Sequence, residues 1–226
     1  MATHQPQPFR NGPPIWRDLI GEALWNDLLE KFPTRWHPHG EQLMAQDERG
    51  RCVMALISGQ VKVIRNESNG AVTLFAIRGP GELLGEVAVQ DGGLRLANVV
   101  ALSRCRVAVM SAPEFRHFVR SNRLESPLNL TGLARWRETT RIQGRGDALF
   151  RLAEALLRFA AVFEPSEPTS VNLRLTRTDL AQHLAVSRNL ISELLADLHC
   201  WVRTGHGHIH IHDLPGLRDF VALHHE

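Results

Sequence analysis

Residues 175–198 constrain the fold of this chain more than any other segment, because they encode two short helices joined by a tight turn. Thr176 can cap the first helix, with Asp179 three residues later as an acidic form of the capping box. After a turn at 185–186, Ser187 can cap the second helix. The apolar residues of both helices recur at helical spacing and predict one shared core: Leu180, Ala181, Leu184, Ile191, Leu194, Leu195 and Leu198. The pattern predicts a helix-turn-helix.

The segment that follows predicts a small β-hairpin. Apolar and polar residues alternate over 201–203 and 209–212, on either side of a glycine-containing turn at 205–208. A helix-turn-helix with such a hairpin after it is a winged helix, whose second helix enters the major groove of DNA. We therefore expect residues 147–226 to bind DNA. The alternative is a winged helix that contacts only other proteins.

The expected DNA contacts surround the start of the second helix. Its exposed amides and the Ser187 hydroxyl suit a backbone phosphate. Arg188 suits a guanine edge and Asn189 an adenine edge, whereas Glu193 either accepts from a cytosine amino group or faces solvent. The full predicted DNA-binding set is Thr176, Arg177, Ser187, Arg188, Asn189, Ser192, Glu193 and His206.

Upstream, residues 36–110 consist of short apolar segments between turn signals. Short segments with turns at close intervals are typical of an antiparallel β-barrel or sandwich. The clearest segments are 52–57, 61–64, 72–77 and 99–109, and the turn signals are Asn69-Gly70, Gly79-Pro80-Gly81 and Asp91-Gly92-Gly93. We expect one amphipathic helix before this region, at 15–32, and a capped helix after it, beginning at Ser111.

A further helix is predicted from Pro127 onward. Four of its residues recur at three-and-four spacing, as in an incomplete coiled-coil seam: Leu133, Trp136, Thr140 and Gln143. The glycines of residues 144–147 interrupt this helix, and Asp147 can cap the next one at 148–163. A polar loop is expected at 164–168. The interruption predicts a hinge between two domains.

A second motif lies at residues 81–97, which read GELLGEVAVQDGGLRLA. A tight turn at Gly85 can aim its amides at an anion, Glu86 can accept from a ribose hydroxyl, and Arg95 can pair with a phosphate. These are the parts of a nucleotide site. Taken alone, however, glycines with one glutamate and one arginine are more often ordinary turns with a salt bridge.

This motif resembles the phosphate-binding cassette of cyclic-nucleotide-binding domains. With the helix, hinge and winged helix after it, the chain resembles the Crp/Fnr family of bacterial transcription regulators from about Ile15 to Leu217. The resemblance implies an α+β fold: an N-terminal antiparallel β-barrel or jelly roll with flanking helices, a long dimerisation helix and a C-terminal winged helix-turn-helix domain. The regions implied are a disordered leader at 1–14, a cyclic-nucleotide-binding-like effector domain at 15–125, the dimerisation helix and hinge at 126–146, and the DNA-binding domain at 147–226.

The resemblance also implies an effector, cyclic AMP or a related cyclic nucleotide. Glu86 would take the ribose hydroxyl, Arg95 the cyclic phosphate, and Thr139 or Thr140 the base. The full implied effector-binding set is Gly85, Glu86, Val87, Arg95, Leu96, Thr139 and Thr140. Leu96 departs from the family pattern, because cyclic AMP binders place Ser or Thr directly after the arginine. The alternative is a regulator without this effector, whose barrel is only a dimer scaffold.

The recognition helix departs from the family pattern as well. Asn189 and Glu193 replace the usual glutamate and arginine, so a different operator is expected. The expected partners are double-stranded DNA with a palindromic operator, a second copy of this chain, and RNA polymerase. The identity of the operator and the choice between activation and repression are not encoded in a readable motif.

Composition excludes several other classes of protein. No apolar run approaches the ~20 residues needed to cross a bilayer, and residues 1–14 lack the basic-then-apolar order of a signal peptide. Cys52, Cys105 and Cys200 are scattered, which indicates buried thiols in a reducing compartment. We therefore expect a cytoplasmic protein with no membrane partner. No catalytic motif is present, so an enzyme that reuses these domains is the least favoured alternative.

Four histidines alternate along the predicted hairpin: His206, His208, His210 and His212. On a strand this spacing places the rings on one face, where they could bind zinc or nickel. A hairpin close to DNA phosphates, or a solvated edge, explains the same spacing. No metal is expected.

Overall fold

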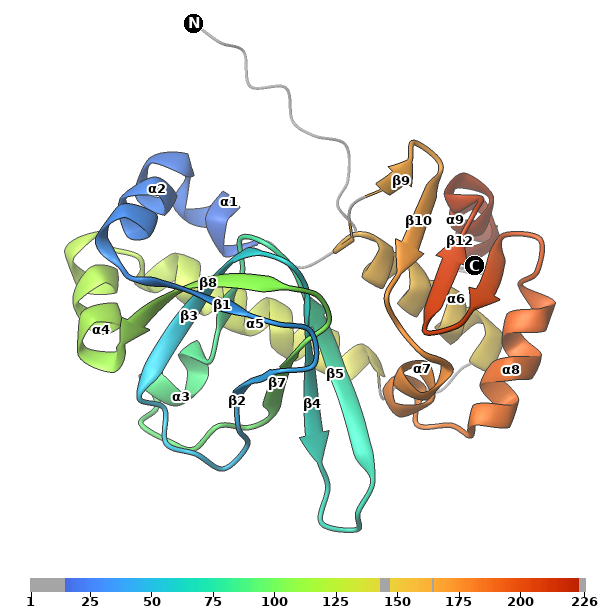
Figure 1. The fold of residues 1–226 in the computed structure, drawn as a ribbon, viewed down its shortest axis with the longest axis horizontal. Coiled ribbons are helices and arrows are strands. Elements are labelled where there is room, and N and C mark those ends of the chain that lie inside the picture. The colour runs from blue at the N-terminus through green and yellow to red at the C-terminus, as the bar shows by residue number, and fades with distance from the viewer. Residues whose placement is uncertain (1–14, 143–146, 164, 224–226) are drawn as a thin grey trace, which may run out of the picture.

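The computed structural model describes residues 15–142, 147–163 and 165–223, and of residues 139–142 and 165 it describes the backbone only. The predicted leader at 1–14 and residues 143–146 of the predicted hinge lie outside this range. Two bodies are visible in Figure 1, a β-rich one formed by the N-terminal half of the chain and a smaller mixed one formed by the C-terminal part.

Within the described residues, two helices rather than one precede the first strand. They are α1 (Trp16–Ile20) and α2 (Glu22–Lys31), and Gly21 between them has φ of 80°. The single helix predicted at 15–32 is therefore wrong, because the chain turns at a left-handed backbone position that glycine adopts readily. Both helices cover the β-rich body through Trp16 and Leu28, which are almost completely buried.

Eight strands form two four-stranded antiparallel sheets. The first sheet has the order β1 (Thr34–His37), β8 (Cys105–Ser111), β3 (Cys52–Ser58) and β6 (Leu83–Leu84). The second has the order β2 (Gln42–Met44), β7 (Asn98–Ala101), β4 (Val61–Asn66) and β5 (Val72–Arg78). One apolar cluster, which includes Leu56, Val61 and Val107, takes side chains from both sheets, so the sheets form the predicted jelly roll around a common core.

The apolar segment at 99–109 is not one strand. It contributes β7 to one sheet and β8 to the other, with a turn at 102–104. The Ser103 hydroxyl accepts from the Gln60 amide at 2.9 Å in this turn. The chain crosses between sheets here, and a pattern of alternating apolar residues carries no signal for such a crossing.

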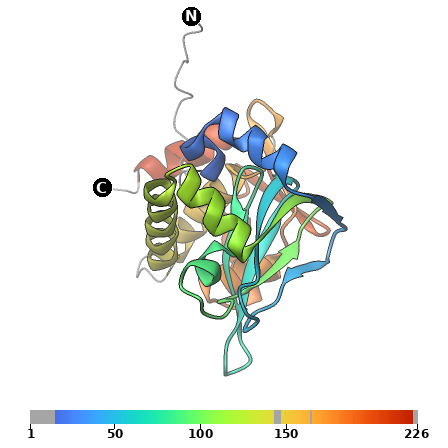
Figure 2. The same cartoon turned by 90° about the vertical axis from the view of Figure 1, so that its left-hand side faces the viewer.

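In chain order, one helix lies between strands of the jelly roll and two follow its last strand. The short helix α3 (Glu86–Gln90) lies between β6 and β7, and α4 (Ala112–Ser121) begins at the predicted Ser111 cap, where Ser111 and Glu114 form a capping box. The long helix α5 (Glu125–Ile142) begins two residues earlier than predicted. In Figure 2, α5 stands at the left-hand edge of the molecule.

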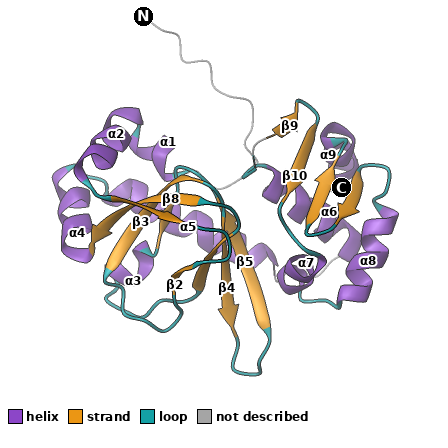
Figure 3. Cartoon of the chain, in the orientation of Figure 1, coloured by secondary structure: helices purple, strands orange, loops and turns teal. Residues whose placement is uncertain are grey.

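The C-terminal body is a winged helix. Its helices are α6 (Ala148–Ala160), α7 (Arg177–Leu184), α8 (Arg188–Asp197) and α9 (Leu214–Leu223), and its sheet has the order β11 (Val202–Gly205), β12 (His208–Ile211), β10 (Ser170–Leu173) and β9 (Pro165–Glu167). Figure 3 shows these helices packed around the small sheet. Asp147 caps α6 as predicted, its side chain accepting from the Leu149 amide at 3.1 Å.

Two predictions for this body are wrong. The helix expected at 148–163 ends at Ala160, and part of the loop expected at 164–168 is the edge strand β9. The strand was not recognisable because it begins with a proline, which is tolerated only at strand starts and edges. β9 forms by pairing with β10, and this contact between strands is not encoded in residues 164–168 themselves.

The three cysteines are free but not equally buried. Cys105 is buried, Cys52 is half-buried and Cys200 is exposed, so the expectation of three buried thiols is correct only for Cys105. Within the part of the chain that the structure describes, no helix combines the length and the apolar character needed to cross a membrane.

Candidate effector pocket and DNA-reading face

The predicted effector residues meet at a cavity of about 350 Å³ in the jelly roll. Five of the seven line it: Gly85, Glu86, Val87, Arg95 and Leu96. Strand residues from β4 and β5, and Arg135 from α5, complete the walls. The remaining two, Thr139 and Thr140, belong to α5, but their side chains lie outside the described part of the structure.

Gly85 lines this cavity at a left-handed backbone position. Its φ of 77° and ψ of 15° place it in the left-handed region, and it directly precedes α3. A Cβ at this position would overlap the guanidinium of Arg95. Glycine is therefore required both for the backbone conformation and for the close approach of the arginine.

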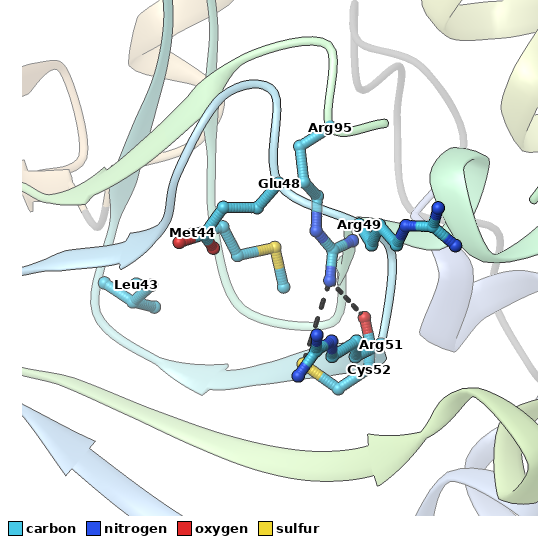
Figure 4. Close-up of a pocket in the computed structure, with 7 residues that line it drawn as sticks. All are labelled: Leu43, Met44, Glu48, Arg49, Arg51, Cys52 and Arg95. Atoms are coloured by element: carbon cyan, nitrogen blue, oxygen red, sulfur yellow. Dashed lines mark hydrogen bonds between the residues drawn. The ribbon is translucent and has the colours of Figure 1, made fainter. Parts of the chain in front are cut away.

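Arg95 is buried but has only uncharged partners. Its Nη1 donates to the Gly85 carbonyl and its Nη2 to the Cys52 carbonyl, both at 2.5 Å. No carboxylate among the described residues forms an ion pair with it. Arg95 also lines a second cavity of about 340 Å³, together with Arg49, Arg51 and Cys52. Figure 4 shows the Arg95 guanidinium in this cavity. Because a buried guanidinium without a counter-charge favours an anion, Arg95 suits a phosphate.

Glu86 has one oxygen engaged and one without a partner. Its side chain is 2% exposed, and Oε1 accepts from Nη1 of Arg135. Oε2 is buried and has no hydrogen-bond partner among the described residues. Burying such an acceptor costs free energy unless a donor reaches it, so Oε2 can accept from a ligand hydroxyl.

Sequence reasoning missed Arg135. Its Nη2 donates to Leu83 O at 2.7 Å and pairs with Glu82 at 3.1 Å, so that this one side chain holds the pocket carboxylates against α5. The available signal was its position one helical turn before Thr139, on the helix face that was expected to reach the pocket. Nothing in the local pattern pairs it with a glutamate 49 residues away.

Buried ion pairs extend from the pocket along α5. Arg78 pairs with Glu138 at 2.6 Å and with Glu82 at 3.6 Å, and Glu82 also pairs with Arg135. Burial by itself would lower the pKa of Arg78, but Glu82 and Glu138 outweigh it and raise the pKa. The alternating charges Glu86, Arg135, Glu82, Arg78 and Glu138 therefore form one continuous chain of contacts.

The predicted DNA-reading residues gather at the start of α8. Ser187 caps the helix, its hydroxyl accepting from the Leu190 amide at 3.1 Å. Arg188 and Asn189 are exposed, as predicted, and Glu193 is exposed too. Ser192 differs, because it is half-buried and its hydroxyl donates to the Arg188 carbonyl at 3.1 Å. The turn between the helices is tight, with Ala185 at φ of 55°.

The remaining members of the predicted DNA-binding set lie around this helix start. Thr176 forms the expected capping box with Asp179, and its hydroxyl donates to Asp179 Oδ2 at 2.6 Å. Arg177 is exposed and reaches Ser192 at 3.4 Å. His206 is exposed in the turn between β11 and β12, at the tip of the hairpin.

The alternating histidines do not converge. The rings of His210 and His212 are 6.4 Å apart between centroids, and His208 contacts the carbonyl of His206 at 3.2 Å. Among residues 15–142, 147–163 and 165–223, no group of three or more His, Cys, Asp or Glu side chains is arranged to hold a metal ion.

Two family models match the chain, a cyclic nucleotide-binding domain at residues 34–122 and a Crp-like helix-turn-helix domain at 150–220. A relative from Mycobacterium tuberculosis, a CRP-like cAMP-activated global transcriptional regulator, is 29% identical over 175 residues, which are 74% of this chain and 78% of that protein.

Two solved structures share the fold. FixK2 from Bradyrhizobium japonicum matches with a TM-score of 0.69 at 18% identity, over 83% of this chain and 96% of that one. The c-di-GMP responsive global regulator CLP from Xanthomonas campestris matches with a TM-score of 0.67 at 21% identity, over 84% of this chain and 98% of that one.

A jelly roll that matches a cyclic nucleotide-binding domain, followed by a long helix and a winged helix, defines a DNA-binding transcription regulator with a separate effector domain. This chain belongs to the Crp/Fnr family of transcription regulators.

Proposed function

We propose that this protein is a homodimeric regulator whose DNA binding is controlled by a nucleotide phosphodiester in the jelly-roll pocket. The observation that carries the proposal is the pair of unsatisfied groups in one cavity. Arg95 is a buried cation with no carboxylate partner among the described residues, and Glu86 has a buried oxygen with no donor. A phosphate and a ribose hydroxyl would satisfy both groups.

In this proposal Arg95 binds the phosphate, Glu86 accepts from the ribose hydroxyl, and Thr139 or Thr140 contacts the base. Gly85 and Val87 line the cavity beside them. Leu96 is 60% exposed and offers no hydroxyl, and one hydrogen bond to a charged group is worth ~1.5–3 kcal/mol. The effector is cyclic AMP or a related nucleotide. The Mycobacterium tuberculosis relative is described as cAMP-activated and the Xanthomonas structure as c-di-GMP responsive.

The dimer would form along α5. Leu130, Leu133 and Trp136 are 49%, 54% and 68% exposed on this helix. Large apolar side chains gathered on one exposed helix mark a contact with another chain. A second copy, related to the first by a twofold axis, would present two α8 helices to one DNA. A palindromic operator matches this symmetry.

On DNA, the start of α8 would enter the major groove. Arg188 and Asn189 would contact bases, and Ser187 with the exposed amides would contact a phosphate. Thr176, Arg177, Ser192, Glu193 and His206 complete the proposed interface. The protein would act in the cytoplasm together with RNA polymerase, and the proposed division of the chain is the effector domain at 15–125, the helix and hinge at 126–146 and the DNA-binding domain at 147–226.

Calorimetry with cyclic AMP and cyclic GMP tests the effector. We expect binding of at least one of them in the micromolar range or tighter, and at least a tenfold loss of affinity in Arg95→Ala. Arg49→Ala is the matched control, because Arg49 lines only the second cavity. Equal affinities for wild type and Arg95→Ala would contradict the proposed phosphate site.

The second candidate is a regulator whose DNA binding needs no cyclic nucleotide. Arg135 favours it, because this residue of the chain itself already occupies one oxygen of Glu86. DNA selected from a random pool should then be bound equally with and without cyclic nucleotide. A cyclic nucleotide that changes this affinity several-fold excludes the second candidate.

A further inference from the structure

The winged helix contacts the jelly roll through α7. Strand β5 is the edge strand of its sheet, and α7 lies beside it (Figure 1). Leu74, Ile77 and Leu102 of the jelly roll belong to the same apolar cluster as the core of the winged helix. An uncovered edge strand exposes backbone N–H and C=O groups that have no partner in the sheet. Helix α7 covers part of this edge, where those groups would otherwise bond to water.

Two polar side chains of α7, one turn apart, reach the jelly roll. Nδ1 of His183 lies 2.9 Å from the Leu74 carbonyl, and Asp179 pairs with Nζ of Lys62 at 2.8 Å. Asp179 is also the third residue of α7, and it completes the capping box with Thr176 at the start of that helix. The same helix that begins the helix-turn-helix is therefore attached to strands β4 and β5.

His183 is 1% exposed, and its partners define its tautomer. The Leu74 carbonyl can only accept, so Nδ1 carries the hydrogen. Nε2 faces Nη2 of Arg158 at 3.4 Å and accepts from it. A second proton on Nε2 would remove this acceptor and set a positive charge against the guanidinium.

Charged groups on two other helices also act on His183. Arg151 and Arg158 of α6 disfavour its protonation and Glu138 of α5 favours it. The Phe159 ring and the imidazole pack in a T-shaped arrangement, with centroids 4.8 Å apart. Burial, followed by the arginines, outweighs the opposing effects of the Leu74 carbonyl and Glu138 and lowers the pKa of His183 to about 4.

We propose that the contact of α7 with β5 and the neighbouring β4, here called the α7–β5 contact and formed by Lys62, Leu74, Asp179 and His183, is a proton-sensitive attachment that sets the orientation of the DNA-reading helix. The contact leaves Arg188, Asn189 and Glu193 exposed, so it orients the reading face without covering it. Protonation of His183 releases α7 from the jelly roll.

The direction of the pH dependence follows from the two states. When α7 is released, His183 returns to an ordinary pKa of 6.5, whereas in the contact it is about 4. The contact is therefore fully stable above pH 6.5 and weakens as the pH falls toward 4. Between pH 8 and pH 5 the opening equilibrium shifts about 30-fold toward the released state.

The Lys62–Asp179 pair does not contribute to this response. Burial alone would raise the pKa of Asp179, but hydrogen bonds from Lys62 and Thr176 lower it overall. The carboxylate therefore stays ionised where His183 titrates. The contribution of the Lys62–Asp179 ion pair to the stability of the contact is therefore constant over this pH range.

Hydrogen–deuterium exchange on the full chain tests the proposal. Protection is expressed relative to the unfolded chain at each pH, and we expect the peptides of β5 and α7 to lose about 30-fold protection between pH 8 and pH 5. His183→Gln, which cannot titrate, should lose this difference. His117→Gln, at an exposed histidine on α4, should behave as wild type. Lys62→Met should lower protection of the same peptides at both pH values.

Three results would overturn the proposal. They are equal protection of β5 and α7 in the wild type at both pH values, a pH difference that persists in His183→Gln, and protection in Lys62→Met equal to that of the wild type. If His183→Gln does not fold, NMR titration of the wild-type histidines replaces it. A His183 resonance with a midpoint near 6.5 would then contradict the proposal.

Discussion

At the scale of single residues, the pocket depends on a few positions that admit one residue type. Gly85 allows the guanidinium of Arg95 to lie against the backbone, and Arg95 in turn joins the cassette to β3 through the Cys52 carbonyl. Glu86 keeps a buried oxygen without a donor. In the proposed function, a ligand hydroxyl would offset the free-energy cost of burying this oxygen.

Gly85→Ala should lower the stability of the protein more than an ordinary glycine substitution in a turn does. The positive φ costs about 1–2 kcal/mol for alanine, and displacing Arg95 adds about 1–3 kcal/mol. Gly92→Ala is the matched control, because Gly92 has φ of 73° with no atom within 4 Å of an added Cβ. Urea unfolding measures both, and equal losses would show that Arg95 does not constrain Gly85.

At the scale of elements, α7 and α8 have different surroundings. Helix α7 attaches the winged helix to the jelly roll, whereas α8 presents its first turn to solvent. Caps at Thr176 and Ser187 start the two helices at defined residues. The caps therefore determine which side chains of α8 stand at its exposed end.

Arg188→Ala should reduce binding to the selected operator by ~1–3 kcal/mol and relax the preference at one base position, because a bidentate contact to a base is lost. Ser187→Ala should weaken binding to all sequences alike. Fluorescence anisotropy with the selected operator and single-base variants distinguishes the two. An equal loss on every sequence for Arg188→Ala would contradict a base-reading role.

At the scale of the whole molecule, α5 contributes residues to three separate regions of the structure. One of its faces supplies Arg135 and Glu138 to the ion-pair chain of the pocket, and another exposes Leu133 and Trp136. Glu138 also acts on His183 in the α7–β5 contact. The pocket, the proposed dimer surface and the surroundings of His183 therefore all include residues of the same helix.

Trp136→Ala should weaken self-association by at least 2 kcal/mol, about 30-fold in the dissociation constant, because a large aromatic side chain at an interface centre contributes strongly. Sedimentation equilibrium measures the change. Trp36→Ala is the matched control, since Trp36 is 52% exposed but lies on β1 and contacts Arg104. A dimer that is unaffected by Trp136→Ala would place the interface elsewhere.

Local chemistry was sufficient to predict the winged helix, and five of the seven residues expected to bind an effector line one cavity. The caps at Ser111, Asp147, Thr176 and Ser187 were readable because a capping side chain bonds to the backbone within three residues of itself. The Crp/Fnr resemblance at residues 81–97 likewise rests on neighbouring residues. The same reasoning failed where Gly21 divides one expected helix, since helical spacing continues across the break.

Tertiary structure alone decided which distant side chains meet. The pairing of Glu86 with Arg135 and of Lys62 with Asp179 joins residues 49 and 117 positions apart, and β7 and β8 separate into different sheets within one apolar segment. Sequence patterns report the periodicity and the ends of elements, because the interactions behind them act over one or two turns. Contacts between elements depend on how apolar faces pack, so the partner of a buried charge such as Glu86 appears only in the folded chain.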